Sequence, residues 1–590
     1  MNLNNERGRS VAALMLGASL LATGALAQDI QQVPREETLV IAGPSDGQTT
    51  FNSPENANPY ILLADIRTGI KSMYEPLFYY NVFQDELIPW LATGYEFNDD
   101  FTEITVNLRE GVKWSDGEAF TADDLVFTAK LMEDSAAGTG ELWNAQEFSL
   151  ATASVEAVDD LTVKFTLEKP MPRYAKKFLV NYFGNGMFWL PEHIWSTVEN
   201  PAEYKFYDPA NGLPVTTSPW TLKLSSPTQI FLDRRDDWWG AETGFHELPA
   251  MKRIVGIPFV NTDRGAQLMV TNQADITMGY PTAALVQNIM RQNPKVTTFS
   301  GDQNPYGSLD WWVSSIWFNH KSENLPEPDV RRAIGLAVDR DLLIQVAYSG
   351  ASEPSRHPFP AFTPLDPYIE VANSVADKHN AAVFDLEESA RLMQEAGYEK
   401  DGDGFWAKDG ERLQYEVEVI PPMRAVGPVI VQLLRKAGFD FAFVSSPETP
   451  GKLFSGNFDI GVFGHNGSID SPLETMRMYH CDNAFELDSG ITSRALARWC
   501  DEEYSALVDE FATYADGDPE AMPIFEKAMD IWYDQAVEIP LSQWYHRIPM
   551  NETHWTNYPS QDNPYLQPAF WYFTGQAGYL YLQLEPANEG

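Results

Sequence analysis

The stretch from Leu413 to Val444 constrains the fold more than any other part of the chain. Residues 413–420 alternate between polar and apolar side chains, as a β-strand does, and residues 439–444 form a second strand-like run. Between them, apolar residues recur at helical spacing over 429–437, and Gly438 follows as a helix stop. A strand, a helix and a strand in this order form a βαβ unit, whose strands lie parallel in one sheet. The sequence therefore predicts an α/β fold.

The chain is too long for a single hydrophobic core. It has 590 residues, of which 44% are hydrophobic, so it carries enough apolar side chains for packed cores. One core rarely extends beyond about 300 residues. We therefore expect at least two lobes.

The N-terminus has the features of a secretory signal. Arg7 and Arg9 precede an apolar run at residues 11–21, and Ala25-Leu26-Ala27 ends it with the small-residue pattern of a cleavage site. We expect the mature chain to begin at Gln28. The apolar run is too short to span a bilayer, which takes about 20 such residues, and no later run of that length is free of charges. Because no Cys follows the run, a bacterial lipid anchor is excluded, and we expect a free periplasmic protein.

Net charge excludes several classes of partner. Lys and Arg total 41 against 84 Asp and Glu, which gives a net charge of −43 and a pI of about 4.4. Nucleic acids and anionic lipids bind to basic patches, so a chain this acidic would repel them. We therefore expect no nucleic-acid partner. The acidic residues are scattered along the chain, which indicates a solvated surface.

The chain contains two cysteines, Cys481 and Cys500, 19 residues apart. In an exported protein this pair favours a disulfide. Closing a loop of that size would stabilise the fold by about 3 kcal/mol. The alternative is two separate buried thiols. A metal pair is not expected, because no C-x-x-C motif occurs and His480 alone adjoins Cys481.

The sequence carries no recognisable catalytic or metal-binding motif. It has no G-x-S-x-G elbow, no H-E-x-x-H helix and no phosphate-binding loop. The run Asp401-Gly402-Asp403-Gly404 lacks the remaining ligands of a calcium loop, so we interpret it as a hairpin turn. We expect no catalytic residue, no cofactor and no metal. A secreted glycoside hydrolase stays as an alternative, because two of the many carboxylates could serve such a reaction.

Four runs of residues carry a more specific signal. They are YEPL at 74–77, PWLA at 89–92, LREGVKWSDGEAFTADD at 108–124 and DVRRAIGLAVDR at 329–340. Read locally, they indicate a β-hairpin followed by a helix that Thr121 caps, and a later helix that Asp329 caps. Together they resemble the signatures of the family 5 solute-binding proteins. Those proteins are extracytoplasmic receptors of ABC importers for short peptides, some oligosaccharides and a few metal chelates.

This resemblance implies a ligand carrier without a catalytic step, which acts as a monomer and delivers its solute to an inner-membrane ABC permease. It implies an α/β fold of the two-lobed periplasmic-binding-protein type, class II, in its large form with an extra subdomain and a hinge of two crossing strands. The expected parts are 1–27 for the signal peptide, 28–70, 211–312 and 544–590 for the first lobe, 71–210 for its extra subdomain, and 313–543 for the second lobe. The crossings would lie near 312–319 and 540–545, and closing of the lobes would be the signal that the permease reads.

Aromatic residues are abundant and gather at the expected hinge. The chain has 17 Trp, 25 Tyr and 33 Phe, with Trp311 and Trp312 in the first crossing and Trp544 and Tyr545 in the second. Tryptophan faces stack on sugar rings and also line pockets for peptide side chains. Most tryptophans nevertheless simply pack in cores. Strand alternation would put Trp311 and Trp312 on opposite faces, so we expect at most one of them to face the cleft.

One further run bears on the class of ligand. Peptide-binding members of the family resemble each other in an Asp, four residues before a Pro, that pairs with the peptide's ammonium. In this chain Ser468 takes that place before Pro472, and the nearest carboxylate is Asp470. A neutral loop suits hydroxyls better than an ammonium, which would need a counter-charge. We therefore expect an oligosaccharide, with an oligopeptide held by Asp470 as the alternative.

These observations define a set of candidate residues. The candidates for ligand binding are Trp311, Trp312, Phe463, His465, Asn466, Ser468, Asp470, Trp544 and Tyr545. Within the loop at 463–472, Asn466, Ser468 and Asp470 would hydrogen-bond the hydroxyls of the ligand. The resemblance places the two cysteines on the surface of the second lobe, close to this loop.

Overall fold

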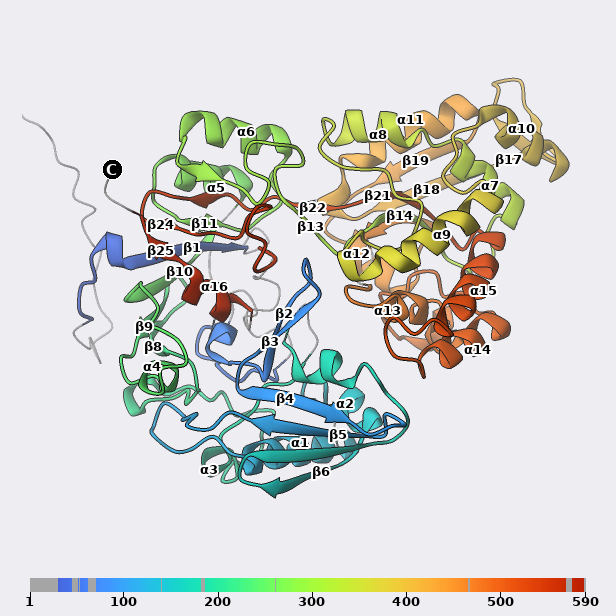
Figure 1. The fold of residues 1–590 in the computed structure, drawn as a ribbon. Coiled ribbons are helices and arrows are strands. Elements are labelled where there is room, and N and C mark those ends of the chain that lie inside the picture. The colour runs from blue at the N-terminus through green and yellow to red at the C-terminus, as the bar shows by residue number, and fades with distance from the viewer. Residues whose placement is uncertain are drawn as a thin grey trace, which may run out of the picture.

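The computed structural model describes residues 30–44, 51, 53–61, 70–138, 141–181, 186–259, 261–464, 467–568 and 576–587. The signal peptide predicted at 1–27 lies outside these residues. Within the described ranges, no helix is long and apolar enough to cross a bilayer. The described chain forms two large sheets with helices packed around them, and a smaller sheet below (Figure 1).

A seven-stranded sheet is the centre of one part of the molecule, which we call the first lobe. In spatial order its strands are β12 Val296–Thr297, β23 Met550–Asn551, β11 Ile276–Thr277, β1 Thr38–Pro44, β10 Arg253–Phe259, β9 Ile230–Arg234 and β8 Trp220–Ser225. Strand β1 runs parallel to β10 and β11, and the other pairs are antiparallel. Helices α5 (Thr262–Val270) and α6 (Ala283–Gln292) lie beside this sheet in Figure 1. Because β23 comes from the last part of the chain, distant segments build this lobe together.

A five-stranded sheet is the centre of a second part, which we call the second lobe. In spatial order its strands are β19 Asp440–Val444, β18 Gln414–Val419, β20 Ile460–Gly464, β14 Ser314–Phe318 and β21 Glu538–Ser542. Strands β18 and β19 are parallel, and helix α11 (Val426–Ala437) connects them. The predicted βαβ unit is therefore confirmed. Gly438 ends α11 in the left-handed conformation (φ 103°), which glycine adopts without strain.

Helices surround the five-stranded sheet (Figure 1). They are α7 Pro328–Leu336, α8 Arg340–Ala347, α9 Asp366–Lys378, α10 Leu386–Glu395, α12 Thr449–Ser455, α13 Leu473–Arg477, α14 Glu502–Phe511 and α15 Ala521–Asp534. A small sheet of β15 Glu399–Lys400, β16 Trp406–Lys408 and β17 Glu411–Arg412 lies at one end. The run at Asp401 forms the turn between β15 and β16, as predicted: its carboxylate accepts the backbone N–H groups of Asp403 and Phe405.

A four-stranded antiparallel sheet with its own helices forms a third part, which we call the extra subdomain. Its strands are β4 Ala92–Phe97, β5 Glu103–Leu108, β7 Thr162–Leu167 and β6 Thr152–Asp159, and its helices are α1 Ala122–Ala137, α2 Ala145–Ala151 and α3 Glu192–Trp195. A π-helical turn, η3 (Ala175–Leu179), precedes α3. A hairpin of β2 Phe78–Asn81 and β3 Glu86–Pro89 projects upward from this sheet in Figure 1. The remaining elements are α4 Trp239–Glu242, α16 Ala577–Gln583, β24 Trp555–Thr556 and β25 Glu585–Pro586.

Two neighbouring segments carry the chain between the two large sheets. Strand β13 (Ser308–Leu309) pairs with β22 (Tyr545–His546), and β14 pairs with β21, both in antiparallel register. The crossing residues are therefore 310–313 on the way out and 543–544 on the way back. Strands β13 and β22 lie between the two lobes in Figure 1. A strand through Trp311 and Trp312 was expected, but β14 begins only at Ser314, because the residues before it bridge two separate sheets.

Local capping was predicted correctly at one helix and wrongly at another. Helix α1 begins directly after Thr121, whose backbone N–H donates to the carboxylate of Asp124. Helix α7 begins at Pro328, so its cap is Glu327 and Asp329 lies in the first turn. Proline fixes φ near the helical value and needs no N–H partner there, so the helix starts two residues earlier than it would with Asp329 as its cap.

Candidate functional site

Three aromatic rings meet where the chain crosses between the lobes. Trp312 lies on the outgoing crossing, Trp544 on the returning one, and Phe463 on β20 of the second lobe. The ring centroid of Trp312 is 5.6 Å from that of Phe463 and 6.4 Å from that of Trp544. Trp312 and Trp544 are each 7% exposed, so their rings are nearly covered. The structure thus brings three of the predicted residues together.

Two tyrosines that the sequence did not single out extend this aromatic cluster. Tyr280 follows β11 in the first lobe, and its ring centroid lies 6.5 Å from Trp544 and 5.6 Å from the stacked ring of His546. Tyr348 follows α8 in the second lobe, and its centroid is 6.2 Å from Trp544. Rings from both lobes therefore surround Trp544. No spacing rule relates positions so far apart in the chain, so only the tertiary structure could find them.

A cavity of about 200 Å³ lies beside Trp544, and we call it the crossover cavity. Its walls include Tyr280, Thr282, Tyr348, Ser349, Trp544 and Tyr545. Among its described lining residues there is no Asp or Glu, whereas several carry hydroxyls. The lining also includes Arg547, whose guanidinium donates to the backbone carbonyls of Pro305, Tyr545 and Ala351. Flat apolar rings combined with hydrogen-bonding groups and no carboxylate suit a ligand that is rich in hydroxyls.

A buried hydrogen bond fixes the crossing segments. Nδ1 of His546 lies 2.8 Å from Oδ2 of Asp310, and both side chains are 2% exposed. The backbone N–H of Asp310 also donates to the carbonyl of Trp544, at 2.9 Å. Because the ring of Tyr280 stacks on His546, this contact positions a first-lobe ring against the crossing.

The other two predicted crossing residues differ in their placement. Tyr545 lines the crossover cavity from β22. Trp311 is 7% exposed and is not among the residues that line this cavity. Of the tandem pair, the ring of Trp312 contacts Phe463 and Trp544 in the aromatic cluster.

The loop before α13 holds Ser468 in a structural role. Ser468 is completely buried, and its hydroxyl accepts the backbone N–H of Thr475, at 3.1 Å. Its own N–H donates to Oγ1 of Thr475, at 3.0 Å. This reciprocal pair ties the loop to α13. His465 and Asn466, also predicted to bind ligand, lie outside the described residues.

Asp470 faces the extra subdomain. Its Oδ2 lies 3.7 Å from Nζ of Lys176, and its side chain is 14% exposed. It lines a second cavity, of about 510 Å³, whose walls come from the extra subdomain and the second lobe. We call this the interlobe cavity. The carboxylate that the sequence offered as an ammonium partner thus has a lysine of the same chain beside it.

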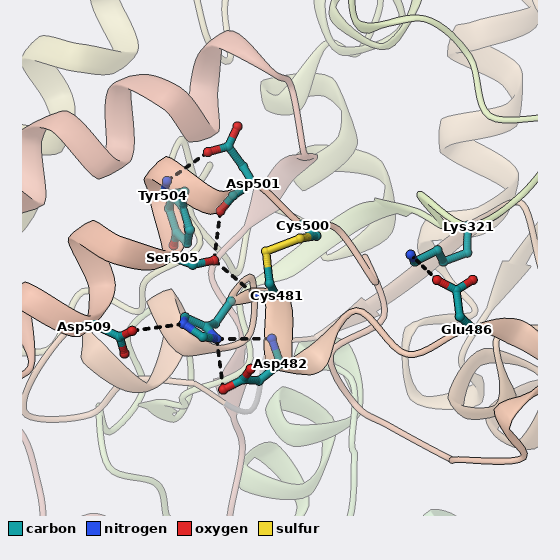
Figure 2. Close-up of a disulfide and its surroundings, with 10 residues drawn as sticks. Lys321, Cys481, Asp482, Glu486, Cys500, Asp501, Tyr504, Ser505 and Asp509 are labelled. Atoms are coloured by element: carbon teal, nitrogen blue, oxygen red, sulfur yellow. Dashed lines mark hydrogen bonds and ion pairs between the residues drawn. A yellow bond between two sulfur atoms is a disulfide. The ribbon is translucent and has the colours of Figure 1, made fainter.

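The predicted disulfide is confirmed. Cys481 and Cys500 are joined, with Cα atoms 4.4 Å apart, in the segment between α13 and α14 (Figure 2). Cys500 is exposed and Cys481 is half-buried. The N–H of Cys481 donates to Oγ of Ser505, at 3.1 Å, which ties the bond to α14. Within the described ranges, no three His, Cys, Asp or Glu side chains are grouped as a metal site.

Solved structures with the same fold come from proteins of low sequence identity. The periplasmic oligopeptide-binding protein of an ABC transporter from Thermotoga maritima is similar with a TM-score of 0.78 and 22% identity, over 94% of this chain and 99% of that one. The same protein with mannohexaose bound is similar with a TM-score of 0.73 and 22% identity, over 95% and 100% of the two chains. These likenesses confirm the expected α/β fold over nearly the whole chain.

Curated relatives are also distant. The glutathione-binding protein GsiB of Pectobacterium atrosepticum is 27% identical over 59% of this chain and 60% of its own length. The heme-binding protein A of Haemophilus influenzae is 24% identical over 90% of this chain and 93% of its own length. Their stated ligands differ widely, so relatedness alone does not select a ligand.

Residues 86–486 match the family described as "Bacterial extracellular solute-binding proteins, family 5 Middle". Proteins of this family are non-catalytic transport receptors, which removes the glycoside hydrolase alternative. The match spans more than half of the chain and includes β14 and its neighbour β20 in the second-lobe sheet. The chain therefore belongs to family 5 of the bacterial extracellular solute-binding proteins, the solute receptors of ABC importers.

Proposed function

We propose that this chain is a periplasmic receptor that closes its two lobes around a short oligosaccharide and delivers it to an inner-membrane ABC permease. The crossover cavity carries the proposal. Its described walls offer aromatic faces and hydroxyls and contain no carboxylate, so they suit sugar rings and provide no counter-charge for an ammonium.

The position of the aromatic cluster supplies a mechanism for closure. Tyr280 belongs to the first lobe, Tyr348 to the second, and Trp544 to the crossing between them. A sugar placed among these rings touches both lobes only when the lobes are together. A ligand shifts a conformational equilibrium only through such differential contact, so stacking at this place favours the closed form.

An oligopeptide is the alternative ligand, and the comparisons support its inclusion. Several relatives are described by peptide ligands, and the Thermotoga maritima protein is described as oligopeptide-binding although it was also seen with mannohexaose. Under this alternative, Asp470 would hold the ammonium of the peptide and would first have to exchange its contact with Lys176.

A ligand screen on the mature protein separates the two classes. Melting temperature and calorimetry would be measured with mannohexaose, with cello-oligosaccharides and with tripeptides to pentapeptides. A ligand at 100 times its dissociation constant stabilises the native state by about 2.7 kcal/mol. We expect this stabilisation with an oligosaccharide. Tight binding of peptides and of no sugar, abolished by Asp470→Asn, would establish the oligopeptide alternative instead.

The Trp544→Ala variant tests the site itself. Losing one stacked aromatic face should weaken sugar binding by roughly 1–3 kcal/mol. Trp499→Ala is the matched control, because Trp499 is also 7% exposed but lies beside the disulfide and does not line the crossover cavity. We expect the control to bind sugar like the wild type. Equal losses in both variants would mean that a general destabilisation, and not stacking, explains the effect.

Several further features follow from the same proposal. The mature receptor begins at Gln28, is a monomer, and has its first lobe at 28–70, 211–312 and 544–590, its extra subdomain at 71–210 and its second lobe at 313–543. The seven-stranded sheet supports the first-lobe boundaries, because its strands β1, β8 to β12 and β23 come from these three stretches of the chain. Sequencing of the N-terminus of the exported protein and its mass in solution test these points.

A further inference from the structure

A second contact joins the extra subdomain to the second lobe, and it is ionic. Nε of Arg173, just before η3, lies 2.6 Å from Oδ1 of Asp516 and 2.9 Å from Oγ of Ser471. In η3, Nζ of Lys177 lies 3.1 Å from Oε1 of Glu474. These partners are about 300 residues apart in the chain, so the contact depends wholly on how the two parts pack together.

Lys176 is the centre of this contact. Its Nζ lies 3.1 Å from Oδ1 of Asp85, 3.7 Å from Oδ2 of Asp470 and 3.9 Å from Oδ2 of Asp516. The carboxylates come from the β2–β3 turn, the loop before α13 and the segment after α14. The ammonium also lies 5.1 Å from the ring centroid of Tyr80, a favourable cation–π distance. One lysine therefore holds three carboxylates from three segments, and we call this group the Lys176 cluster.

The balance of charges in the Lys176 cluster makes the loss of the lysine destabilising. Arg173 and Lys176 supply its two cations against the three carboxylates. Burial by itself disfavours the charged ammonium, but Asp470, Asp516 and Asp85 outweigh it and hold the pKa of Lys176 above its usual value. The lysine is thus charged at any physiological pH. Without it, carboxylates would face one another across a partly buried space, which is unfavourable.

The interlobe cavity connects this cluster to solvent. Lys176 and Asp470 both line it, and Leu150, another of its walls, is 74% exposed. Its volume of about 510 Å³ lies within the range of roughly 300–1,000 Å³ typical of small-molecule sites. A small cation from solution can therefore reach the carboxylates if the lysine does not fill their centre.

We propose that Asp85, Asp470 and Asp516 form a site for a primary ammonium group, and that the ammonium of Lys176 occupies this site from within the chain. Lys176 is thereby a specificity-determining residue. Because the chain supplies this cation itself, a solute gains nothing from carrying an ammonium of its own, and the closed receptor selects solutes that lack one. The selection of solutes rests on the function proposed above, whereas the ammonium site does not.

Chemical rescue tests the site directly, without any knowledge of the natural solute. The Lys176→Ala variant should melt on the order of 5 °C below the wild type, because it breaks a partly buried ionic group. Methylammonium chloride should then raise the melting temperature of the variant in a saturable way, by mass action on the emptied site. Tetramethylammonium, which donates no hydrogen bond, should not. Lys176→Gln provides a second variant that keeps most of the side chain, should the alanine variant fail to fold.

Lys130→Ala is the matched control. Lys130 also contacts two carboxylates, Glu133 at 3.0 Å and Asp134 at 2.9 Å, but its side chain is 60% exposed. Its loss should change the melting temperature little, and methylammonium should have no effect. The site would be disproved if methylammonium stabilised neither Lys176→Ala nor Lys176→Gln. It would also be disproved if methylammonium acted equally on the control, or no better than sodium chloride.

Paired solutes test the selection. Chitosan oligosaccharides carry a primary ammonium on each sugar, and cello-oligosaccharides of the same length do not. The measured quantity is the ratio of the affinity for the amino sugar to the affinity for its neutral counterpart. This ratio should be at least tenfold higher for Lys176→Gln than for the wild type. An unchanged ratio, with rescue still observed, would reject the selection but keep the ammonium site. Binding of peptides alone by the wild type would reject the proposed oligosaccharide and leave the rescue result unaffected.

Discussion

Removing the disulfide should destabilise the second lobe by about 3 kcal/mol. Cys481 and Cys500 are 19 residues apart, and the loop-closure entropy of a loop of that size corresponds to about 3 kcal/mol at 25 °C. The segment between them has only short 3-10 turns, at Cys481–Asn483 and Leu487–Ser489, so little regular structure would hold it once the bond is absent. The double variant Cys481→Ser, Cys500→Ser makes this change without leaving a single reactive thiol.

Other contacts of this segment should survive in the variant. Arg498 is 1% exposed, and its Nη atoms donate to the carbonyls of Phe485 and Phe454, at 2.9 Å and 3.0 Å. Ser505 keeps its place in α14 (Figure 2). The expected loss is therefore limited to the loop-closure contribution, and the segment should keep its native conformation.

Urea unfolding followed by circular dichroism gives the global effect, and hydrogen exchange of α13 and α14 gives the local one. Both are needed, because the lobes of a large protein can unfold separately. Ser505→Ala is a suitable comparison, since it removes one hydrogen bond to Cys481 and should cost only about 1 kcal/mol. If the double variant lost less than about 1 kcal/mol, the contacts of Arg498 would already restrict this loop in the unfolded chain, and the entropic argument would be refuted.

Two further predictions concern the ionic contact and the packing of α11. The nearby ammonium of Lys177 is the main cause that lowers the pKa of the Glu474 carboxyl in the folded protein. The ionised Glu474 side chain therefore stabilises the fold above its unfolded pKa of about 4.5, and this contribution is lost as the pH falls through the folded-state pKa. The difference in melting temperature between the wild type and Glu474→Gln should therefore become smaller as the pH is lowered. Melting curves recorded over a series of acidic pH values measure it, and a difference that stays constant would contradict this prediction. Gly427→Ala should destabilise the second lobe by roughly 1–3 kcal/mol, because the new Cβ would lie 2.6 Å from the ring of Phe443. Urea unfolding checks it, and an unchanged midpoint would show that the ring moves aside freely.

Consecutive elements were accessible from the sequence because their patterns are local. The βαβ unit of β18, α11 and β19 is continuous in the chain, and its apolar spacing together with Gly438 sufficed to predict it. The start of α1 after Thr121 likewise depends on neighbouring residues alone. The place of Trp544 among the crossing residues came from the family resemblance, since nothing in its own surroundings marks a connection between sheets.

Contacts between distant segments were not accessible. Asp85, Lys176, Asp470 and Asp516 share no spacing. In a chain with 84 acidic residues nothing marks Asp85, Lys176 or Asp516, and Asp470 was singled out only through the family resemblance. Ser468 illustrates a different limit. Its side chain was predicted to face a ligand, but its hydroxyl lies against the first residues of α13, because a short polar side chain there satisfies backbone N–H groups.

The Lys176 cluster and the aromatic cluster around Trp544 differ in whether a ligand adds contacts to them. The Lys176 cluster is complete in the protein alone, since the chain supplies both its cations and its carboxylates. The aromatic cluster instead borders a cavity of about 200 Å³, where a bound solute would add contacts to the lining residues Tyr280, Tyr348 and Trp544. An interaction that is the same with and without ligand lowers the cost of closure equally for every solute, whereas an interaction completed by the ligand distinguishes one solute from another. Under the proposed function, the rings around Trp544 therefore distinguish solutes by the contacts that each solute adds on closure. The Lys176 cluster is already filled by the chain, so an ammonium on the solute adds no such contact there.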